Sequence, residues 1–282
     1  MKNYDLALSL GFSCGGSMAL RAAGLQFSSF PFDWTGAPGI VAGARMIAAE
    51  FDGWMERGDL VLHDIRRGGF DKHVYRNVRT GYGFPHDFSS FRTFDENFTE
   101  IAEKYRRRAA RLLEALRRSK RVLVVYVERP IWSRCSDDEL LETRRILQGK
   151  FPSVSVDILY FHQDTGCTVP AEADIDTGIT AVACDYRRMD HGEVSHTVDI
   201  HPLTDYLKAH VSVVDGRTED ERRQYAMGVK ERKSAKWGDG GFLRRKLNQL
   251  EYRLFRNLER DLTEKGMVPR ERPMWFPSER SE

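Results

Sequence analysis

Two apolar stretches that each follow a helix pattern constrain the fold of this chain most strongly. Arg121–Val127 is rich in β-branched residues and comes soon after a helix pattern at 97–118. Residues 154–161 follow a second helix pattern, Leu140–Gln148, in the same way. Strands that are apolar along their whole length are covered on both faces, as in a parallel sheet. We therefore predict an α/β fold, with a three-layer, mostly parallel, Rossmann-like sheet and helices on both faces.

The rest of the chain adds shorter elements and a second part. The further predicted elements are a strand at Leu6–Leu10, helices at 14–24 and 39–57, an aromatic turn at 28–34 and a strand at Ile179–Cys184. Residues 60–95 lack a clear period, which is typical of functional loops. Beyond residue 216 the sequence is strongly charged and predicts helix, followed by an extended tail. We predict an α/β domain over residues 1–215 and a charged helical extension with a tail over 216–282.

Composition and motifs exclude several classes of protein. The 44 Lys+Arg against 42 Asp+Glu leave a net charge of +2, which gives no global attraction to nucleic acid. The opening residues contain no signal sequence, and the longest apolar run is far shorter than the ~18 residues of a membrane span. We expect a cytoplasmic protein without a membrane span. Neither glycine-rich nucleotide motifs nor metal-ligand spacings occur, so we expect no cofactor and no metal.

Cys14 is the best candidate for chemistry. It lies at the junction of the first predicted strand and helix, where unpaired N–H groups and the helix dipole stabilise a thiolate. Open α/β sheets also bind ligands at the carboxyl ends of their strands. The alternative interpretation is that Cys14 is a small buried residue, with Gly15 and Gly16 present only for close packing. The same segment matches the G-x-S-x-G pattern of a nucleophile elbow, which makes Ser13 an alternative nucleophile.

Three spaced motifs follow one another in the first half of the chain. They are Ser9-Leu10-Gly11-Phe12-Ser13-Cys14, then Ser29-Phe30-Pro31-Phe32-Asp33-Trp34, then Tyr82-Gly83-Phe84-Pro85-His86-Asp87-Phe88 ahead of an arginine-rich helix. With these motifs the chain resembles a bacterial family of uncharacterised proteins described as putative papain-like cysteine peptidases. The resemblance implies that Cys14 is the nucleophile and His86 its base. It also implies that Asp33 and Asp87 occupy the acidic positions of the family.

A cysteine hydrolase needs a thiolate, an imidazole and a group that orients the imidazole. Adjacent residues of an extended chain point in opposite directions, so Asp87 is a poor orienter for His86. Asp33 or Asn77 is the better candidate, although a buried Asp33 that only holds a loop is the alternative interpretation. The N–H groups of Gly15 and Gly16 would form the oxyanion hole.

Comparison with papain itself favours a different fold around the thiol. Papain-type enzymes carry a glutamine six positions before the nucleophile, where this chain has Leu8 inside a predicted strand. A strand that leads directly into the thiol is a Rossmann-like arrangement.

Two further hypotheses remain open. Asp199-Ile200-His201-Pro202 resembles the acid–His–Pro element of SGNH esterases, although one residue instead of two separates the acid from the histidine. In that case Asp199 and His201 would serve an esterase or acetyltransferase that acts on glycans, unless His201 is only a solvent-facing residue at a turn. Alternatively, the basic residues of 104–121 and 230–260 would bind an acidic polymer in a non-catalytic module. The leading hypothesis is a thiol hydrolase whose unknown substrate is a peptide, an ester or a glycan-linked acyl group.

Overall fold

The computed structural model describes residues 1–12, 14–66, 72–89, 92–128, 134–167, 169–190, 193–223 and 227. By its contacts the chain divides into two units, one of residues 1–66 and 72–220 and the other of residues 67–71 and 221–282. All helices and strands named below belong to the first unit. The extension predicted over 216–282 lies almost wholly outside the described residues, so the predicted domain boundary stays a prediction.

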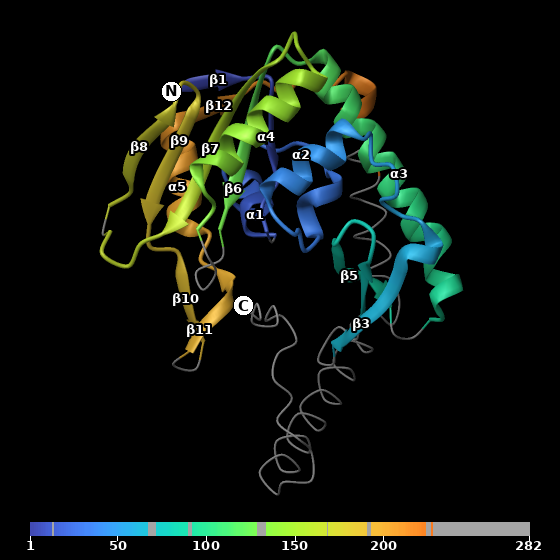
Figure 1. Cartoon of the computed structure of the whole chain (residues 1–282). Helices are drawn as coiled ribbons and strands as arrows, with labels where there is room; N and C mark the ends of the chain where they lie inside the picture. Colours follow the sequence, from blue (N-terminus) through green and yellow to red (C-terminus); the bar gives the residue numbers. More distant parts are fainter. Residues whose placement is uncertain are drawn as a thin grey trace, which may run out of the picture. The chain divides into compact units, whose positions relative to one another are not determined.

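A five-stranded, mostly parallel sheet forms the centre of the first unit (Figure 1). The strand order is β2 (Leu6–Ser9), β6 (Arg121–Val127), β7 (Ser155–Gln163), β9 (Ile179–Cys184) and β8 (Ala171–Asp176). The first four strands are parallel, and β8 runs antiparallel to β9 at the edge of the sheet. The predicted α/β class with a mostly parallel sheet is therefore confirmed.

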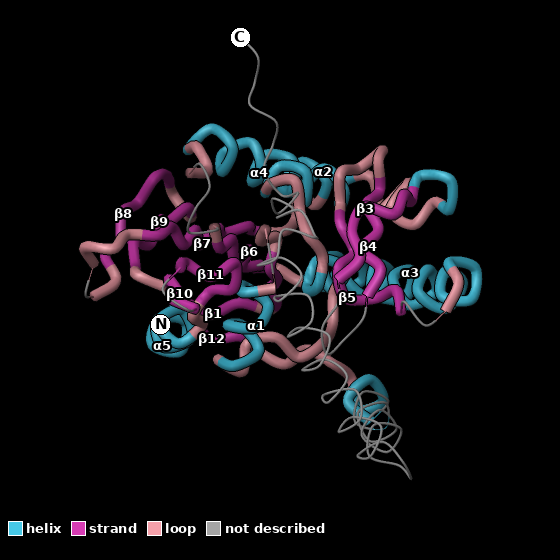
Figure 2. Tube along the Cα trace, turned by 90° about the horizontal axis from the view of Figure 1, so that it is seen from below, coloured by secondary structure: helices cyan, strands magenta, loops and turns pink. Residues whose placement is uncertain are grey.

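Alternate residues of the central strands enter two separate hydrophobic cores. Val122, Val124 and Tyr126 of β6 pack with helices α2, α3 and α4. Leu123, Val125 and Val127 of the same strand pack with α1 and α5 on the other face. The helices are α1 (Gly15–Ala22), α2 (Ile40–Ala48), α3 (Phe94–Arg118), α4 (Asp137–Lys150) and α5 (His201–His210). Figure 2 shows α2 and α4 on one side of the sheet and α1 and α5 on the other. This double burial explains why β6 is apolar at every position after the first.

Side-chain caps define where the two longest helices begin. The Thr93 hydroxyl accepts the N–H of Glu96, and the Glu96 carboxylate accepts the N–H of Thr93, which forms a capping box at α3. Ser136 and Glu139 form the same box at α4. Helix α1 differs, because Cys14 is its N-cap residue and makes no side-chain capping bond within the described part of the chain.

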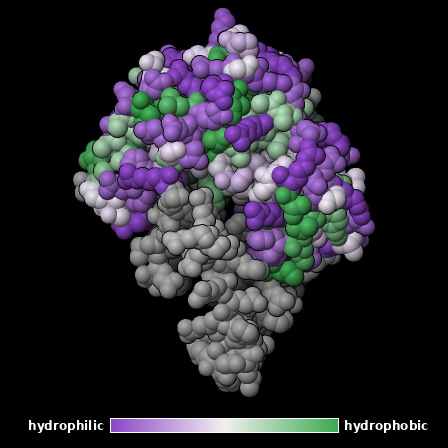
Figure 3. All heavy atoms as spheres, viewed as in Figure 1, coloured by the Kyte–Doolittle hydropathy of each residue, from purple (hydrophilic) through white to green (hydrophobic). Residues whose placement is uncertain are grey.

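Residues 60–66, 72–77 and 83–89 form a three-stranded antiparallel sheet, where the sequence had predicted loops. Its strands are β3 (Leu60–Arg66), β4 (Lys72–Asn77) and β5 (Gly83–Ser89). The prediction was wrong because register shifts in both strand pairs, between Leu62 and Asp64 and between His73 and Tyr75, interrupt the alternation of buried and exposed residues. Along the edge strand β3, several apolar side chains are exposed, and hydrophobic atoms gather at this part of the surface (Figure 3).

The aromatic turn predicted at 28–34 contains the 3-10 turn η1 (Pro31–Trp34). Several short elements were not predicted. They are β1 (Lys2–Tyr4) paired in parallel with β12 (Val211–Val213), the antiparallel pair β10 (Arg187–Asp190) and β11 (Glu193–Val198), helix α5, and the 3-10 turn η2 (Arg57–Asp59). Most of them are too short to show a period in the sequence. Among the described residues, no helix combines the length and the apolar character that a membrane crossing requires.

Candidate active site

Cys14 lies at the carboxyl edge of the central sheet, where β2 leads into α1. The pairing of β2 with β6 continues past Ser9, because the Leu10 N–H donates to the Val125 carbonyl at 3.1 Å. The chain then turns, and the Cys14 carbonyl accepts the Met18 N–H at 2.8 Å as the first bond of the helix. The Cys14 side chain is partly buried. Ser13, the alternative nucleophile, lies outside the described residues.

The first turn of α1 rests directly on the ends of β2 and β6. A Cβ atom at Gly16 would lie 2.4 Å from Ser9 Oγ and 3.5 Å from Val127 Cγ2. The close packing therefore favours a glycine at position 16, as the alternative interpretation of this residue held. The same close approach brings the amino end of α1 to the carboxyl edge of the sheet. The predicted oxyanion role of the Gly15 and Gly16 N–H groups stays a prediction.

Backbone bonds connect the strand of His86 to the loop that precedes Cys14. His86 is exposed on β5, and its ring packs edge-on against Trp34 with the centroids 6.1 Å apart. Gly36 and Gly83 exchange two backbone hydrogen bonds of 2.9 Å each, which fastens the turn after Trp34 to β5. The N–H of residue 37 also donates to the carbonyl of residue 12 at 3.5 Å. The turn at 34–37 thus joins both segments.

Asp33 is fully buried at the centre of a local network. Its Oδ1 accepts the Ser17 hydroxyl at 3.0 Å, and its Oδ2 accepts Arg21 Nη2 at 2.6 Å and the Phe30 N–H at 2.9 Å. Gln26 Nε2 lies 2.9 and 3.0 Å from the two oxygens. Since a carboxylate offers about four lone-pair sites, these donors occupy its capacity. Asp33 therefore holds α1 to the η1 turn, and a role as orienter of His86 would require one donor to leave.

Asp87 and Asn77, which were also considered as groups that could orient His86, make structural contacts too. The Asp87 carboxylate turns towards α3, where it accepts the hydroxyl of Tyr105 at 2.5 Å and pairs with Lys104. The buried Asn77 donates through Nδ2 to the Gly53 carbonyl at 2.7 Å. Its Oδ1 accepts the N–H groups of residues 79 and 80, both at 2.9 Å. Asp87 therefore stabilises the contact between β5 and α3, and Asn77 stabilises the turn that follows β4.

The acid–histidine pair of the esterase hypothesis is arranged differently from a catalytic pair. Asp199 Oδ1 accepts the main-chain N–H of His201 at 3.0 Å, at the start of α5. His201 is exposed on the first turn of that helix. The contact stabilises the helix start. The exposed His201 agrees with the alternative interpretation of a solvent-facing residue, although it begins a helix and does not lie in a turn.

The surroundings of the other three cysteines favour the protonated thiol. Burial and the carboxylates of Glu139 and Glu128 raise the pKa of Cys135 well above its ordinary value. Burial raises the pKa of Cys184 to about 12. Partial desolvation and Asp164 raise the pKa of Cys167. A thiolate at neutral pH is therefore disfavoured at these three positions.

A buried carboxyl group that the sequence analysis missed lies at the same edge of the sheet. Glu128 directly follows β6 and is 6% exposed. Its Oε2 accepts the Tyr160 hydroxyl and, at 3.3 Å, the Cys135 N–H. Burial raises the pKa of Glu128 above its ordinary value, and these hydrogen bonds offset part of the effect. A lone acid that ends a fully apolar strand was the signal for it, because α/β sheets carry functional side chains there.

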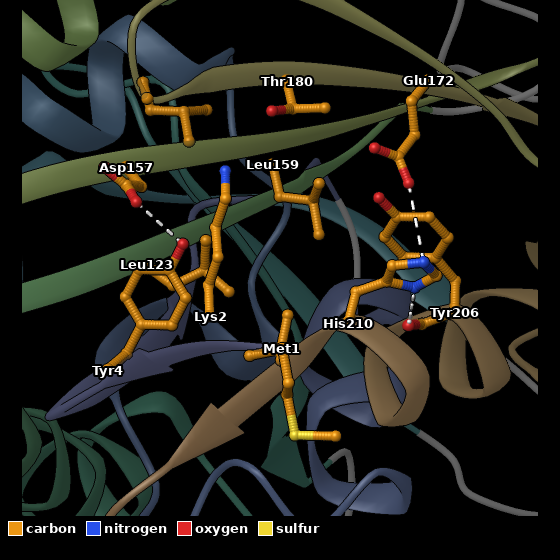
Figure 4. Close-up of a pocket in the computed structure, with 13 residues that line it drawn as sticks. Met1, Lys2, Tyr4, Leu123, Asp157, Leu159, Glu172, Thr180, Tyr206 and His210 are labelled. Atoms are coloured by element: carbon orange, nitrogen blue, oxygen red, sulfur yellow. Dashed lines mark hydrogen bonds and ion pairs between the residues drawn. The ribbon is translucent and has the colours of Figure 1, made fainter.

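A cavity of about 220 Å³ lies at the opposite edge of the sheet, between β1, the first residues of β7 and β9, and the end of α5 (Figure 4). Four of its polar groups form two pairs. The Tyr4 hydroxyl donates to Asp157 at 2.8 Å, and His210 Nε2 lies 3.6 Å from Glu172. Cys14 does not line this cavity, since it follows the carboxyl end of β2. Among the described residues, no group of three His, Cys, Asp or Glu side chains could hold a metal ion.

Comparison with the profiles of known protein families identifies the family of this chain. Residues 5–145 match the profile of the family described as "Putative papain-like cysteine peptidase (DUF1796)". The chain belongs to this family. The match covers half of the chain and includes Cys14, Asp33, His86 and Glu128. It confirms the predicted family, whereas the family roles of individual residues stay predictions.

One curated relative is viral. It is "Uncharacterized protein R408" of Acanthamoeba polyphaga mimivirus, 30% identical over 142 residues, which are 44% of this chain and 62% of the relative. The chain thus spans less than two thirds of that protein. A bacterial origin of the chain stays a prediction. No solved structure is significantly similar to it.

Proposed function

We propose that the protein is a cysteine hydrolase with a three-layer, Rossmann-like architecture, in which Cys14 is the nucleophile and His86 the general base. The observation that carries the proposal is the position of Cys14 at the N-cap of α1, on the carboxyl edge of a mostly parallel sheet. The family match supports a cysteine hydrolase in general terms. We also propose a cytoplasmic location, where the thiol stays reduced.

In this mechanism, the amino end of α1 stabilises the thiolate of Cys14, and His86 holds the proton that the thiol has lost. The thiolate attacks the carbonyl carbon of an acyl substrate, and the Gly15 and Gly16 N–H groups receive the developing oxyanion. Water then hydrolyses the thioester. The bonds around Asp33 support a positioning role, in which it fixes Trp34, and thereby the His86 ring, relative to α1.

The proposed substrates are acyl compounds: peptides, esters or glycan-linked acyl groups. The hydrogen bond from His201 N–H to Asp199 gives the esterase alternative no support. We therefore centre the test on the thiol.

Labelling with iodoacetamide across a pH series, followed by peptide mapping, tests the assignment of Cys14. We expect Cys14 to react at least about ten-fold faster than the other cysteines near neutral pH. Cys135, Cys167 and Cys184 should begin to react only at higher pH, because their raised pKa values keep the thiolate scarce until the pH approaches them.

The matched variants are His86→Ala and His210→Ala, of which only the first should slow the labelling of Cys14. Equal, slow labelling of all four cysteines would contradict the proposal. So would an unchanged Cys14 rate in His86→Ala.

A further inference from the structure

We propose that Glu128 is a general acid of this site, which donates a proton from Oε1 to the leaving group of the acyl substrate. The inference rests on the proposed function, because it needs Cys14 as the nucleophile. It adds a second proton donor to the site and identifies its substrates as acyl compounds with poor leaving groups, such as alkyl esters or amides.

The topology of the sheet brings Glu128 and Cys14 to one place. The chain leaves β2 towards α1, which covers one face, and leaves the neighbouring β6 towards α4, which covers the other. Ligands of open α/β sheets bind where adjacent strands diverge in this way. Cys14 follows β2 and Glu128 follows β6, so the two residues flank this point. A Cβ atom added at Gly16 would lie 3.5 Å from Cγ2 of Val127, the residue before Glu128, which shows how closely the two segments approach.

The two oxygens of Glu128 have different environments. Both described donors, the Tyr160 hydroxyl and the Cys135 N–H, bind Oε2. Within the ranges that the structure describes, no donor binds Oε1, although the residue is 6% exposed. Oε1 is thus the atom that remains for a ligand.

The surroundings of Glu128 suit both its protonated form and the carboxylate that remains after it gives up the proton. Burial raises the pKa of the carboxyl group, which favours the protonated form before reaction. After the transfer, the hydrogen bonds at Oε2 and the positive charge of Arg134 stabilise the carboxylate. The donors are in place before the charge develops, so little reorganisation accompanies the transfer.

The proposed step balances as follows. The electron pair of the Cys14 thiolate forms the S–C bond, and the carbonyl π pair moves to oxygen. When the C=O bond re-forms, the bond to the leaving group breaks, and the leaving atom keeps the pair and takes the proton of Glu128. A thioester, the neutral leaving group and the Glu128 carboxylate remain. Water then attacks the thioester and gives one proton to Glu128, which releases the carboxylic acid and restores the thiolate.

Acylation by aryl acetates of different leaving groups tests the role of Glu128. The probes are p-nitrophenyl acetate, whose anion leaves unaided, and phenyl and p-methoxyphenyl acetate, whose anions need a proton. The full-length Glu128→Gln variant keeps the shape and the acceptor oxygen but has no acidic proton. We expect its single-turnover acylation by phenyl acetate, followed by intact mass, to fall about 100-fold. Acylation by p-nitrophenyl acetate should change by no more than about two-fold.

Three control variants distinguish a failure of the general-acid role of Glu128 from a failure of the proposed nucleophile Cys14. Glu114→Gln, a change at an exposed acid of α3, should react like the wild type with every ester. Tyr160→Phe should slow phenyl acetate selectively by about ten-fold, and it provides the same test if Glu128→Gln does not fold. An equal loss with all esters in a folded Glu128→Gln variant would overturn the general-acid role and leave Cys14 untouched. Persistent acylation of Cys14→Ala would instead overturn the proposed function, and this inference with it.

Discussion

At the scale of single residues, Asp33 illustrates how one buried carboxylate holds several segments of the chain together. Its carboxylate joins Ser17 and Arg21 of α1 to the turn that carries Trp34. A buried acceptor with this many donors is costly to alter, because each donor would lose its partner inside the protein.

We predict that Asp33→Asn lowers the free energy of unfolding by about 3 kcal/mol, since the amide removes the charge that Arg21 needs and places an N–H₂ group against donors. Urea unfolding measures the change. Asp95→Asn is the matched control, because the Asp95 side chain is 66% exposed, and it should cost less than about 1 kcal/mol. A loss at Asp33 as small as that of the control would show that the network contributes little.

At the scale of elements, the packing of α1 on the sheet decides where the thiol lies. Gly16 allows the helix to approach β2 and β6, and Ser9 Oγ accepts the N–H of Gly11 at 3.1 Å in the turn between them. A larger residue at position 16 would move the amino end of α1, and with it Cys14.

We predict that Gly16→Ala destabilises the protein by about 1–3 kcal/mol, because its methyl group overlaps Ser9 Oγ. Gly149→Ala in α4 is the opposite control. Apart from its chain neighbours and the backbone of its own helix, no heavy atom of the described residues lies within 4 Å of the added Cβ, so this change should stabilise the helix by about 0.5–1 kcal/mol. Thermal unfolding compares the two variants. Adding Ser9→Ala to Gly16→Ala should recover part of the loss, and full additivity of the two changes would contradict the steric cause.

At the scale of the whole molecule, the two cores share the strands of one sheet. Residues on opposite sides of β6 belong to different cores, so neither core can be lost without exposing the other. The described residues up to 220, apart from the β3–β4 connection, also form one unit by their contacts.

We therefore predict that a chain ending at residue 220 folds and unfolds in one cooperative transition. Circular dichroism and tryptophan fluorescence should report the same urea midpoint. Two separate midpoints would show that the two cores unfold independently. A chain without a cooperative transition would show that residues 221–282 are required for the fold.

The sequence by itself determined the α/β class, the main strands and helices, the family and the position of Cys14 between a strand and a helix. These features are readable because hydrophobic periodicity and short motifs act over neighbouring residues. The antiparallel sheet of residues 60–89 was missed for the same reason, since register shifts disturb its local period.

Only the tertiary structure decided which polar groups meet. Glu128 and Tyr160 are 32 residues apart in the chain, and Tyr4 and Asp157 are 153 apart. The pairing of such groups depends on strand order, on which face of the sheet each helix covers and on how closely α1 approaches it. No local pattern encodes these properties, so the occupied carboxylate of Asp33 and the partly unpaired one of Glu128 became visible only in the folded chain.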